Sequence, residues 1–106
     1  MQDSNTNNDW VATGEGARRR VLAHEPQMMM VEFDFQAGAV GALHSHPHIQ
    51  STYVAAGVFE FTVDGETKTL KAGDSLIIPS NAVHGCVATE PGTLIDTFTP
   101  RRDDFL

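Results

Sequence analysis

Seven consecutive residues decide how this chain is interpreted: His44-Ser45-His46-Pro47-His48-Ile49-Gln50. Side chains two apart on an extended segment point to the same side, so the sequence predicts His44 and His46 on one face of a strand. A third histidine, His84, follows 38 residues after His46, beyond a predicted turn and buried strand at 73–79. Neutral imidazole nitrogens bind zinc, nickel, copper and iron, so these residues predict a site for one divalent transition metal.

Gln50 is the fourth candidate ligand, supplied with His84 from other segments of the chain. A lone histidine is usually an ordinary core or surface residue, but three at this spacing favour a metal site. Glutamine is a neutral, weak ligand, so the ion would keep more of its positive charge and act as a stronger Lewis acid. Alternatively, Gln50 lies behind the ligands without touching the ion. Pro47 permits a bend, so His48 is either a ligand or substrate contact, or a residue at the rim of the site.

The rest of the chain consists of short alternating runs separated by glycine and proline turns, which is typical of an all-β sandwich or barrel. Met29, Val31, Phe33 and Phe35 share one predicted face, and Asp64-Gly65 is a strong hairpin signal. No convincing helical periodicity is present. The predicted strands are 18–23, 27–36, 51–56, 58–63, 66–70, 75–78, 83–88 and 93–99.

Length and composition limit the classes of protein. A chain of 106 residues predicts one domain, here residues 10–106, preceded by a polar, flexible segment at 1–9. The net charge of −7 argues against a nucleic-acid partner, and the Arg18-Arg19-Arg20 cluster is interpreted as a solvated strand or edge. The single cysteine, Cys86, excludes an internal disulfide. No apolar run suits a signal peptide or a membrane span, so we expect a cytoplasmic protein without a membrane partner.

The last predicted strand carries an aspartate between apolar neighbours, with Leu94, Asp96 and Phe98 on one face. A carboxylate on a buried face is costly unless it has a partner. Asp96 is therefore either a structural hydrogen-bond acceptor or a general acid/base with a shifted pKa, and a metal-bearing barrel favours the second interpretation. Arg102 lies just beyond this strand and is either a clamp for a carboxylate or part of a solvated tail.

The spacing of these residues resembles the two motifs of the cupin family. The first runs from Gly38 through His44, His46 and Gln50 to Gly57, and the second from Gly73 through Pro79 to His84. The resemblance implies a small, single-domain jelly-roll β-barrel. Three positions depart from the usual pattern: Gln50 replaces a glutamate, Asn81 replaces a glycine, and Ala88, which is not a ligand position, replaces a common asparagine. Asparagine tolerates left-handed backbone better than most residues, so the second turn can be kept.

From Trp10 to Leu106 the chain is similar to a narrower group of cupins that act on 4,5-unsaturated uronates released from pectin or alginate. This resemblance implies an isomerase-type enzyme, a cytoplasmic homodimer, that opens the ring and releases the linear ketonised sugar acid. Nickel or zinc is the expected metal, with iron or manganese also allowed. The implied metal ligands are His44, His46, Gln50 and His84, and the implied catalytic residues are Asp96, Phe98 and Arg102.

Two other functions are compatible with the same residues. A cupin dioxygenase acting on a small organic acid would need a redox metal and a site for dioxygen. A non-catalytic sugar- or metal-binding module would need neither turnover nor an acid/base residue. Metal identity and the fate of the substrate double bond distinguish these functions from ring opening.

Overall fold

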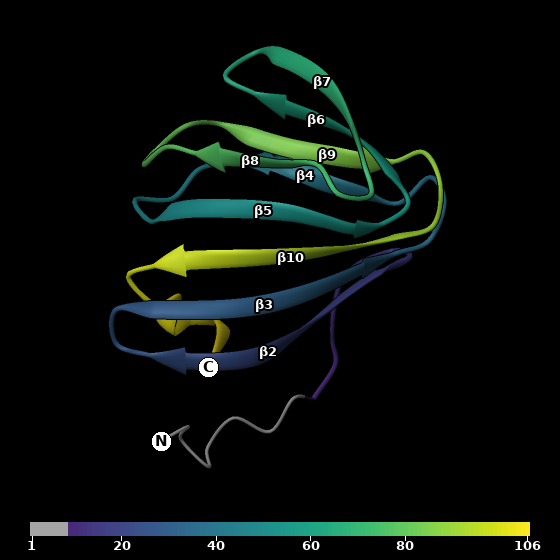
Figure 1. Cartoon of the computed structure of the whole chain (residues 1–106). Coiled ribbons are helices and arrows are strands. Elements are labelled where there is room, and N and C mark those ends of the chain that lie inside the picture. Colours follow the sequence, from purple (N-terminus) through teal and green to yellow (C-terminus); the bar gives the residue numbers. More distant parts are fainter. Residues whose placement is uncertain (1–8) are drawn as a thin grey trace.

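The computed structural model describes residues 9–106, and most of them lie in two antiparallel sheets (Figure 1). The larger sheet has the order β1-β2-β3-β10-β5-β8, and the smaller has the order β4-β9-β6-β7. This architecture confirms the all-β prediction. The strands are β1 (Val11–Gly14), β2 (Ala17–Glu25), β3 (Met28–Phe35), β4 (Val40–His44), β5 (Ile49–Ala56), β6 (Val58–Val63), β7 (Glu66–Lys71), β8 (Ser75–Ile78), β9 (His84–Ala88) and β10 (Gly92–Thr99).

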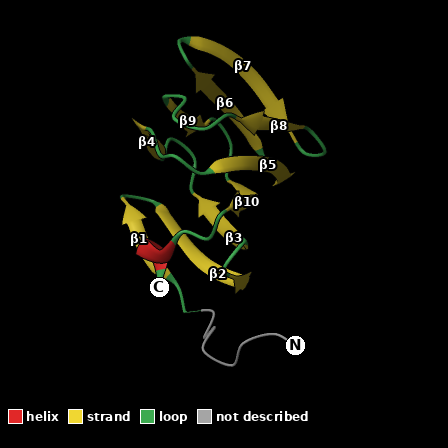
Figure 2. Cartoon of the chain, turned by 90° about the vertical axis from the view of Figure 1, so that its left-hand side faces the viewer, coloured by secondary structure: helices red, strands yellow, loops and turns green. Residues whose placement is uncertain are grey.

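Two predictions concern the flexible N-terminal segment with its domain boundary and the absence of a membrane span. The predicted flexible segment at 1–9 lies, apart from Asp9, outside the described residues, so the domain boundary at residue 10 stays a prediction. At the other end, a short 3-10 turn, η1 (Asp103–Phe105), follows β10 and lies against β2 and β3 (Figures 1 and 2). Between residues 9 and 106, no helix has the length and apolar character needed to cross a bilayer.

Strand β10 is central to the larger sheet because it pairs with β3 on one side and β5 on the other. The predicted alternation in β3 is confirmed: Met29, Val31 and Phe35 are buried, whereas Met28 and Met30 are exposed. Cross-strand partners point to the same face of a sheet. The inward side chains of β3, β10 and β5 therefore form one continuous wall, and the site described below is built on it.

Two predictions about turns are confirmed, and one about a strand is wrong. Asp64 and Gly65 both have positive φ, as a two-residue hairpin turn requires, and Asn81 has a φ of 66°. The segment 75–78 is not a buried strand: β8 is an edge strand, with Ile78 fully buried and Ile77 63% exposed. An apolar run alone does not distinguish a strand covered on both faces from one covered on a single face.

Gly57 combines a φ of +85° with a close backbone approach, so a side chain there has no space. A Cβ at this position would collide with the carbonyl oxygen of Pro91. We expect Gly57→Ala to lower the free energy of unfolding by about 3 kcal/mol or more, since steric overlap adds to backbone strain. Gly73 is the matched control because its φ is +95° but, apart from its own chain neighbours, no described residue has an atom within 4 Å of a Cβ placed there. Gly73→Ala should cost about 1–2 kcal/mol, from backbone strain alone; equal losses in chemical denaturation would contradict the steric argument.

Candidate metal centre and its pocket

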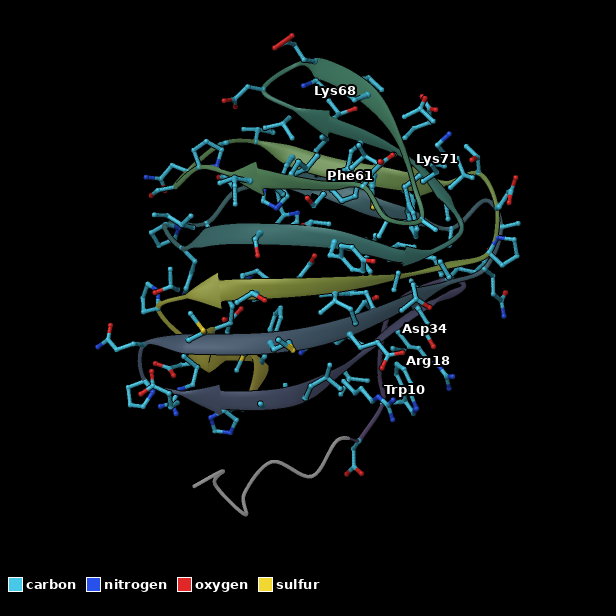
Figure 3. The ribbon with its side chains drawn as sticks, in the orientation of Figure 1. Trp10, Arg18, Asp34, Phe61, Lys68 and Lys71 are labelled. Carbon is cyan, nitrogen blue, oxygen red and sulfur yellow. The ribbon has the colours of Figure 1, made fainter. Side chains whose placement is uncertain are left out.

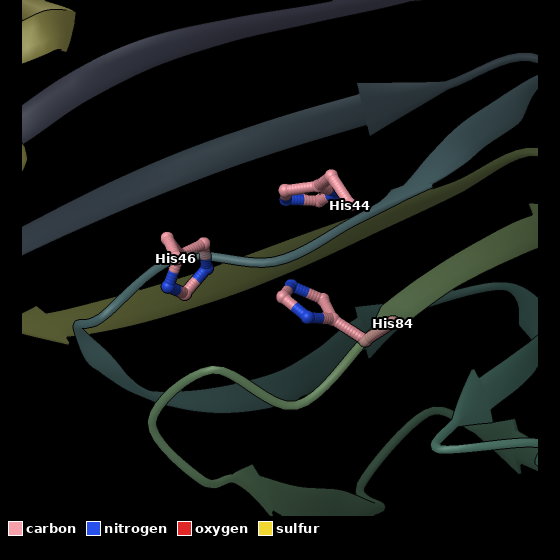
Figure 4. A group of neighbouring side chains, drawn as sticks. All are labelled: His44, His46 and His84. Atoms are coloured by element: carbon pink, nitrogen blue, oxygen red, sulfur yellow. The ribbon is translucent and has the colours of Figure 1, made fainter.

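Three histidines converge at one end of the space between the two sheets. The side chains of His44, His46 and His84 point toward one another (Figure 4), and their ligand nitrogens all lie within 4.8 Å of one another. Two nitrogens bound to one zinc-sized ion are about 3–4 Å apart, given metal–nitrogen bonds of about 2.0–2.1 Å. A small closure of this triad would therefore allow all three imidazoles to contact a single ion.

The elements that supply these histidines differ from the sequence prediction in one respect. Strand β4 ends at His44, and His46 lies in the connection to β5, so the two do not share one face of a strand. Pro47 lacks an N–H group, and the connection bends so that the His46 ring lies 3.1 Å from the carbonyl oxygen of His48. His84, the first residue of β9, is the direct cross-strand partner of His44.

Backbone carbonyl groups fix the tautomer of all three rings. Nδ1 of His44 lies 2.8 Å from the Ala42 oxygen, and Nδ1 of His84 lies 2.9 Å from the Ala82 oxygen. Nδ1 of His46 meets the His48 carbonyl in the same way. A carbonyl oxygen can only accept, so each Nδ1 must carry the proton, and each Nε2 keeps a free lone pair. Metal-binding histidines are commonly oriented by such a bond.

Three buried acceptor atoms at the triad fit a cation. Nε2 of His84 is buried and has no hydrogen-bond partner within residues 9–106. Nε2 of His46 lies 3.0 Å from Oε1 of Gln50, whose amide nitrogen donates elsewhere, so two acceptors face each other. Acceptors at this distance require a shared proton or cation between or beside them. A metal ion would satisfy these three atoms together.

The local electrostatics also suit metal binding. Burial is the main factor that lowers the pKa of His46, and the nearby Arg102 guanidinium lowers it further. Burial likewise lowers the pKa of His84, assisted by its two histidine neighbours. Both imidazoles are therefore neutral at neutral pH, which is the form that binds a metal.

Gln50 connects the triad to Asp96. Its amide nitrogen donates to Oδ2 of Asp96 and to Oγ1 of Thr52, at 3.0 Å in each case. These residues are brought together because Asp96 and Thr52 are cross-strand partners of β10 and β5, and Gln50 lies two residues before Thr52 on the same face. An amide can accept on one side and donate on the other, which a glutamate at position 50 could not do.

Asp96 is a buried carboxyl group with an unusual acidity. Burial raises the pKa of Asp96 to about 7, although hydrogen bonds from Thr52 and Gln50 and the charge of Arg102 act in the opposite direction. Its second oxygen, Oδ1, is buried without a partner among the described residues. At neutral pH the carboxyl group is therefore present in both protonation states, which suits a group that accepts and returns a proton.

A cavity of about 250 Å³ connects the histidines with the C-terminal residues, and its lining includes His44, His84, Asp96, Phe98 and Arg102. This volume is just below the usual range for drug-sized ligands, about 300–1,000 Å³, and fits a monosaccharide better than a longer chain.

Phe98 and Arg102 form part of one cavity wall. The Phe98 ring lies 5.7 Å from the His46 ring, and the Arg102 guanidinium lies over Phe98 at 5.1 Å. Arg102 is not a solvated tail residue: its side chain is 11% exposed and forms two hydrogen bonds to the Asp104 carboxylate. It therefore already binds a carboxylate with both prongs of its guanidinium group.

Three residues that help to build the site were not predicted from the sequence: Thr52, which bonds to Gln50, and Phe105 and Arg19, which line the cavity. Thr52 carries no signal beyond being polar in a buried strand. Phe105, in the last turn, packs edge-on against Phe98 at 5.7 Å and closes the cavity. Arg19 also lines the cavity, so the interpretation of 18–20 as uniformly solvated is wrong for its middle residue. The alternation of side chains along the predicted strand was the available signal, because it places Arg19 on the opposite face from Arg18 and Arg20.

Three other residues have no part in the triad. The His48 ring is 5.4 Å from the His46 ring, and its backbone carbonyl orients His46. His24 accepts a hydrogen bond from Arg101 at 3.2 Å. Burial raises the pKa of Cys86 to about 12, so its thiol stays protonated and is not a nucleophile.

Known proteins share this architecture. The family model described as "Cupin domain" matches residues 31–98. The pectin degradation protein KdgF of Dickeya dadantii is 44% identical over 99 residues, which cover 92% of this chain and 90% of that protein.

Two solved structures extend the comparison. KdgF from Halomonas sp. superimposes with a TM-score of 0.89 at 43% identity and covers 96% of this chain and 94% of its own. An RmlC-like cupin from Shewanella frigidimarina gives a TM-score of 0.90 at 39% identity, and the match covers 99% of this chain and 95% of that protein. Since the family motifs, the fold and nearly the whole length agree, this chain belongs to the cupin family and, within it, to the group that includes KdgF.

Proposed function

We propose that this protein converts 4,5-unsaturated uronate monosaccharides, released from pectin or alginate, into the linear ketonised sugar acid. The observation that carries the proposal is the placement of Asp96. It is a buried carboxyl group with a pKa near neutrality, joined through Gln50 to a histidine triad and opening into a cavity that also contains Arg102. The 44% identity to a pectin degradation protein supports the substrate class.

The reaction is a balanced isomerisation and needs no redox step. The bond between the anomeric carbon and the ring oxygen breaks while the anomeric hydroxyl loses its proton, which produces an aldehyde and an enol at C5. A proton is then added at C4, the enol hydroxyl loses its proton, and C5 becomes a ketone beside the carboxylate. The number of protons is unchanged, so one group that accepts and returns a proton is sufficient.

Asp96 is the residue suited to this proton transfer. Its carboxyl group exists in both forms near neutral pH, and Oδ1 has no competing partner among residues 9–106. The Gln50 amide holds Oδ2, which fixes the orientation of the carboxyl group toward the cavity. A positioned general acid/base typically contributes about 10²–10⁴-fold to a rate.

Arg102 and Phe98 orient the substrate. The planar guanidinium matches a carboxylate with two parallel hydrogen bonds, as its pairing with Asp104 already demonstrates. In our proposal it binds the uronate carboxylate. The Phe98 ring gives the sugar an apolar surface and keeps water from the triad side of the cavity.

His44, His46 and His84, with Gln50, would hold one divalent cation. When bound, the cation supplies Lewis-acid stabilisation of negative charge on a substrate oxygen. Because no oxidation state changes in the reaction, zinc or nickel suffices, and this choice of metal stays a prediction. The homodimer and the cytoplasmic location implied by the family resemblance also stay predictions.

The direct test is to incubate the purified protein with unsaturated galacturonate and follow the double bond by ultraviolet absorbance and proton NMR. We expect the alkene signal to disappear as the linear keto acid accumulates, and turnover to stop when a chelator removes the metal. Oxygen consumption in step with turnover would instead indicate a dioxygenase. Tight uronate binding with the alkene intact would indicate a binding module.

A further inference from the structure

Arg19 stands apart from the two arginines beside it. It is the cross-strand partner of Phe33, which in turn pairs with Leu94, so its side chain lies on the same inward face as Asp96. Arg18 and Arg20 lie on the outward face, where they form ion pairs with Asp34 at 3.6 Å and Glu32 at 2.8 Å. Figure 3 shows Arg18 and Asp34 together on that outer side, beside Trp10.

The Arg19 guanidinium has no hydrogen-bond acceptor and no ion-pair partner among residues 9–106. Its guanidinium carbon lies 4.0 Å from the centre of the Phe105 ring. Arg102 lies over the same ring at 4.3 Å. Two guanidinium groups therefore meet at one aromatic side chain on the cavity wall, and only Arg102 has a carboxylate bonded to it.

The two guanidinium groups carry two positive charges, and the Asp104 carboxylate beside them offsets one. Burial lowers the pKa of Arg19, the nearby Asp104 raises it, and the Arg102 charge lowers it again. Arginine nevertheless stays charged at neutral pH, so both cations persist. A positive site inside a chain with a net charge of −7 attracts a small anion to that point and not to the surrounding surface.

The position of Asp104 indicates which anion fits. Its carboxylate is 2.9 and 3.1 Å from two nitrogens of Arg102, and its charge also acts on Arg19. Asp104 is 60% exposed and belongs to the terminal turn, so it can be displaced at little cost. A carboxylate can accept from more than one guanidinium group, because its two oxygens offer about four lone-pair sites.

We propose that Arg19 is a specificity-determining residue that binds the carboxylate of the substrate together with Arg102. This inference rests on the proposed function for the identity of the sugar, but it requires only a carboxylate of monosaccharide size. Arg19 contributes to binding in both the ground state and the transition state, since the carboxylate keeps its charge throughout the reaction. Its removal therefore affects KM more than kcat.

The test compares Arg19→Gln with Arg18→Gln, which removes the same charge from the outward face of the same strand. We expect Arg19→Gln to raise KM for unsaturated galacturonate by about 10- to 100-fold, the usual effect of losing a hydrogen bond to a charged group, while kcat changes by less than about threefold. Arg18→Gln should leave both constants unchanged. Arg19→Lys keeps the positive charge but lacks the planar guanidinium group, so its KM should lie between those of the wild type and Arg19→Gln.

A second measurement separates this inference from the proposed function. NMR titration with saturated galacturonate and with neutral galactose reports binding without turnover. Arg19→Gln should weaken galacturonate binding and leave galactose unchanged, even if the wild-type protein proves unable to consume the unsaturated sugar. Equal KM and equal galacturonate affinity in Arg19→Gln and Arg18→Gln would overturn the assignment. If Arg19→Gln fails to fold by circular dichroism, the same comparison is made with Arg19→Lys.

Discussion

Replacing His84 by alanine is expected to empty the metal site and to lower kcat/KM by about 10³-fold or more. His84 is the most informative position because its Nε2 is buried and has no other partner within the described chain. Metal stabilisation of developing charge is worth several kcal/mol, and each 1.36 kcal/mol is about tenfold in rate. Metal content by mass spectrometry, measured beside activity, separates loss of the ion from loss of the fold.

The matched control is His48→Ala. That imidazole lies outside the triad, and its contribution to the site comes from a backbone carbonyl that alanine retains. We expect this variant to keep one equivalent of metal per chain. A His84→Ala protein that binds metal and turns over substrate like the wild type would contradict the ligand assignment. A His48→Ala protein that loses its metal would extend the ligand set.

The second large effect is expected for Asp96→Asn, which keeps the shape of the side chain but cannot transfer a proton. We expect kcat to fall by about 10²–10⁴-fold while metal content and the affinity for saturated galacturonate stay close to the parent values. Asparagine can still accept the hydrogen bond from Gln50, so the geometry around position 96 is preserved. An unchanged kcat in this variant would remove Asp96 from the proton-transfer role.

Asp96→Asn is also expected to remove a pH dependence of the free energy of unfolding that the parent protein has. The folded state holds the Asp96 proton up to about pH 7, whereas an unfolded aspartate releases it near its ordinary value of 3.8. The unfolded state therefore binds fewer protons between these pH values, and the free energy of unfolding falls as pH rises from about 4 to 7. The loss reaches on the order of 4 kcal/mol, since each pKa unit corresponds to about 1.36 kcal/mol. Denaturant titrations of the chelated protein should show this slope in the parent and not in Asp96→Asn.

Much of the fold was accessible from local rules. Alternation predicted the inward face of β3, and Asp64-Gly65 predicted the β6–β7 hairpin, because each depends only on neighbouring residues and backbone preference. The same rules misjudged β8, since an apolar run is compatible with burial on one face or on both. The motif spacing identified the three histidines that the structure brings together.

What the sequence by itself determined is therefore most of the strands and turns and the presence of imidazoles capable of sharing an ion. Only the tertiary structure decided that His46 leaves the strand, that Gln50 reaches Asp96 across 46 residues, and that Arg19 faces the cavity instead of solvent. The physical reason is that these contacts depend on the register between strands far apart in the chain. Register is set by the packing of whole sheet faces, and no short segment carries that information.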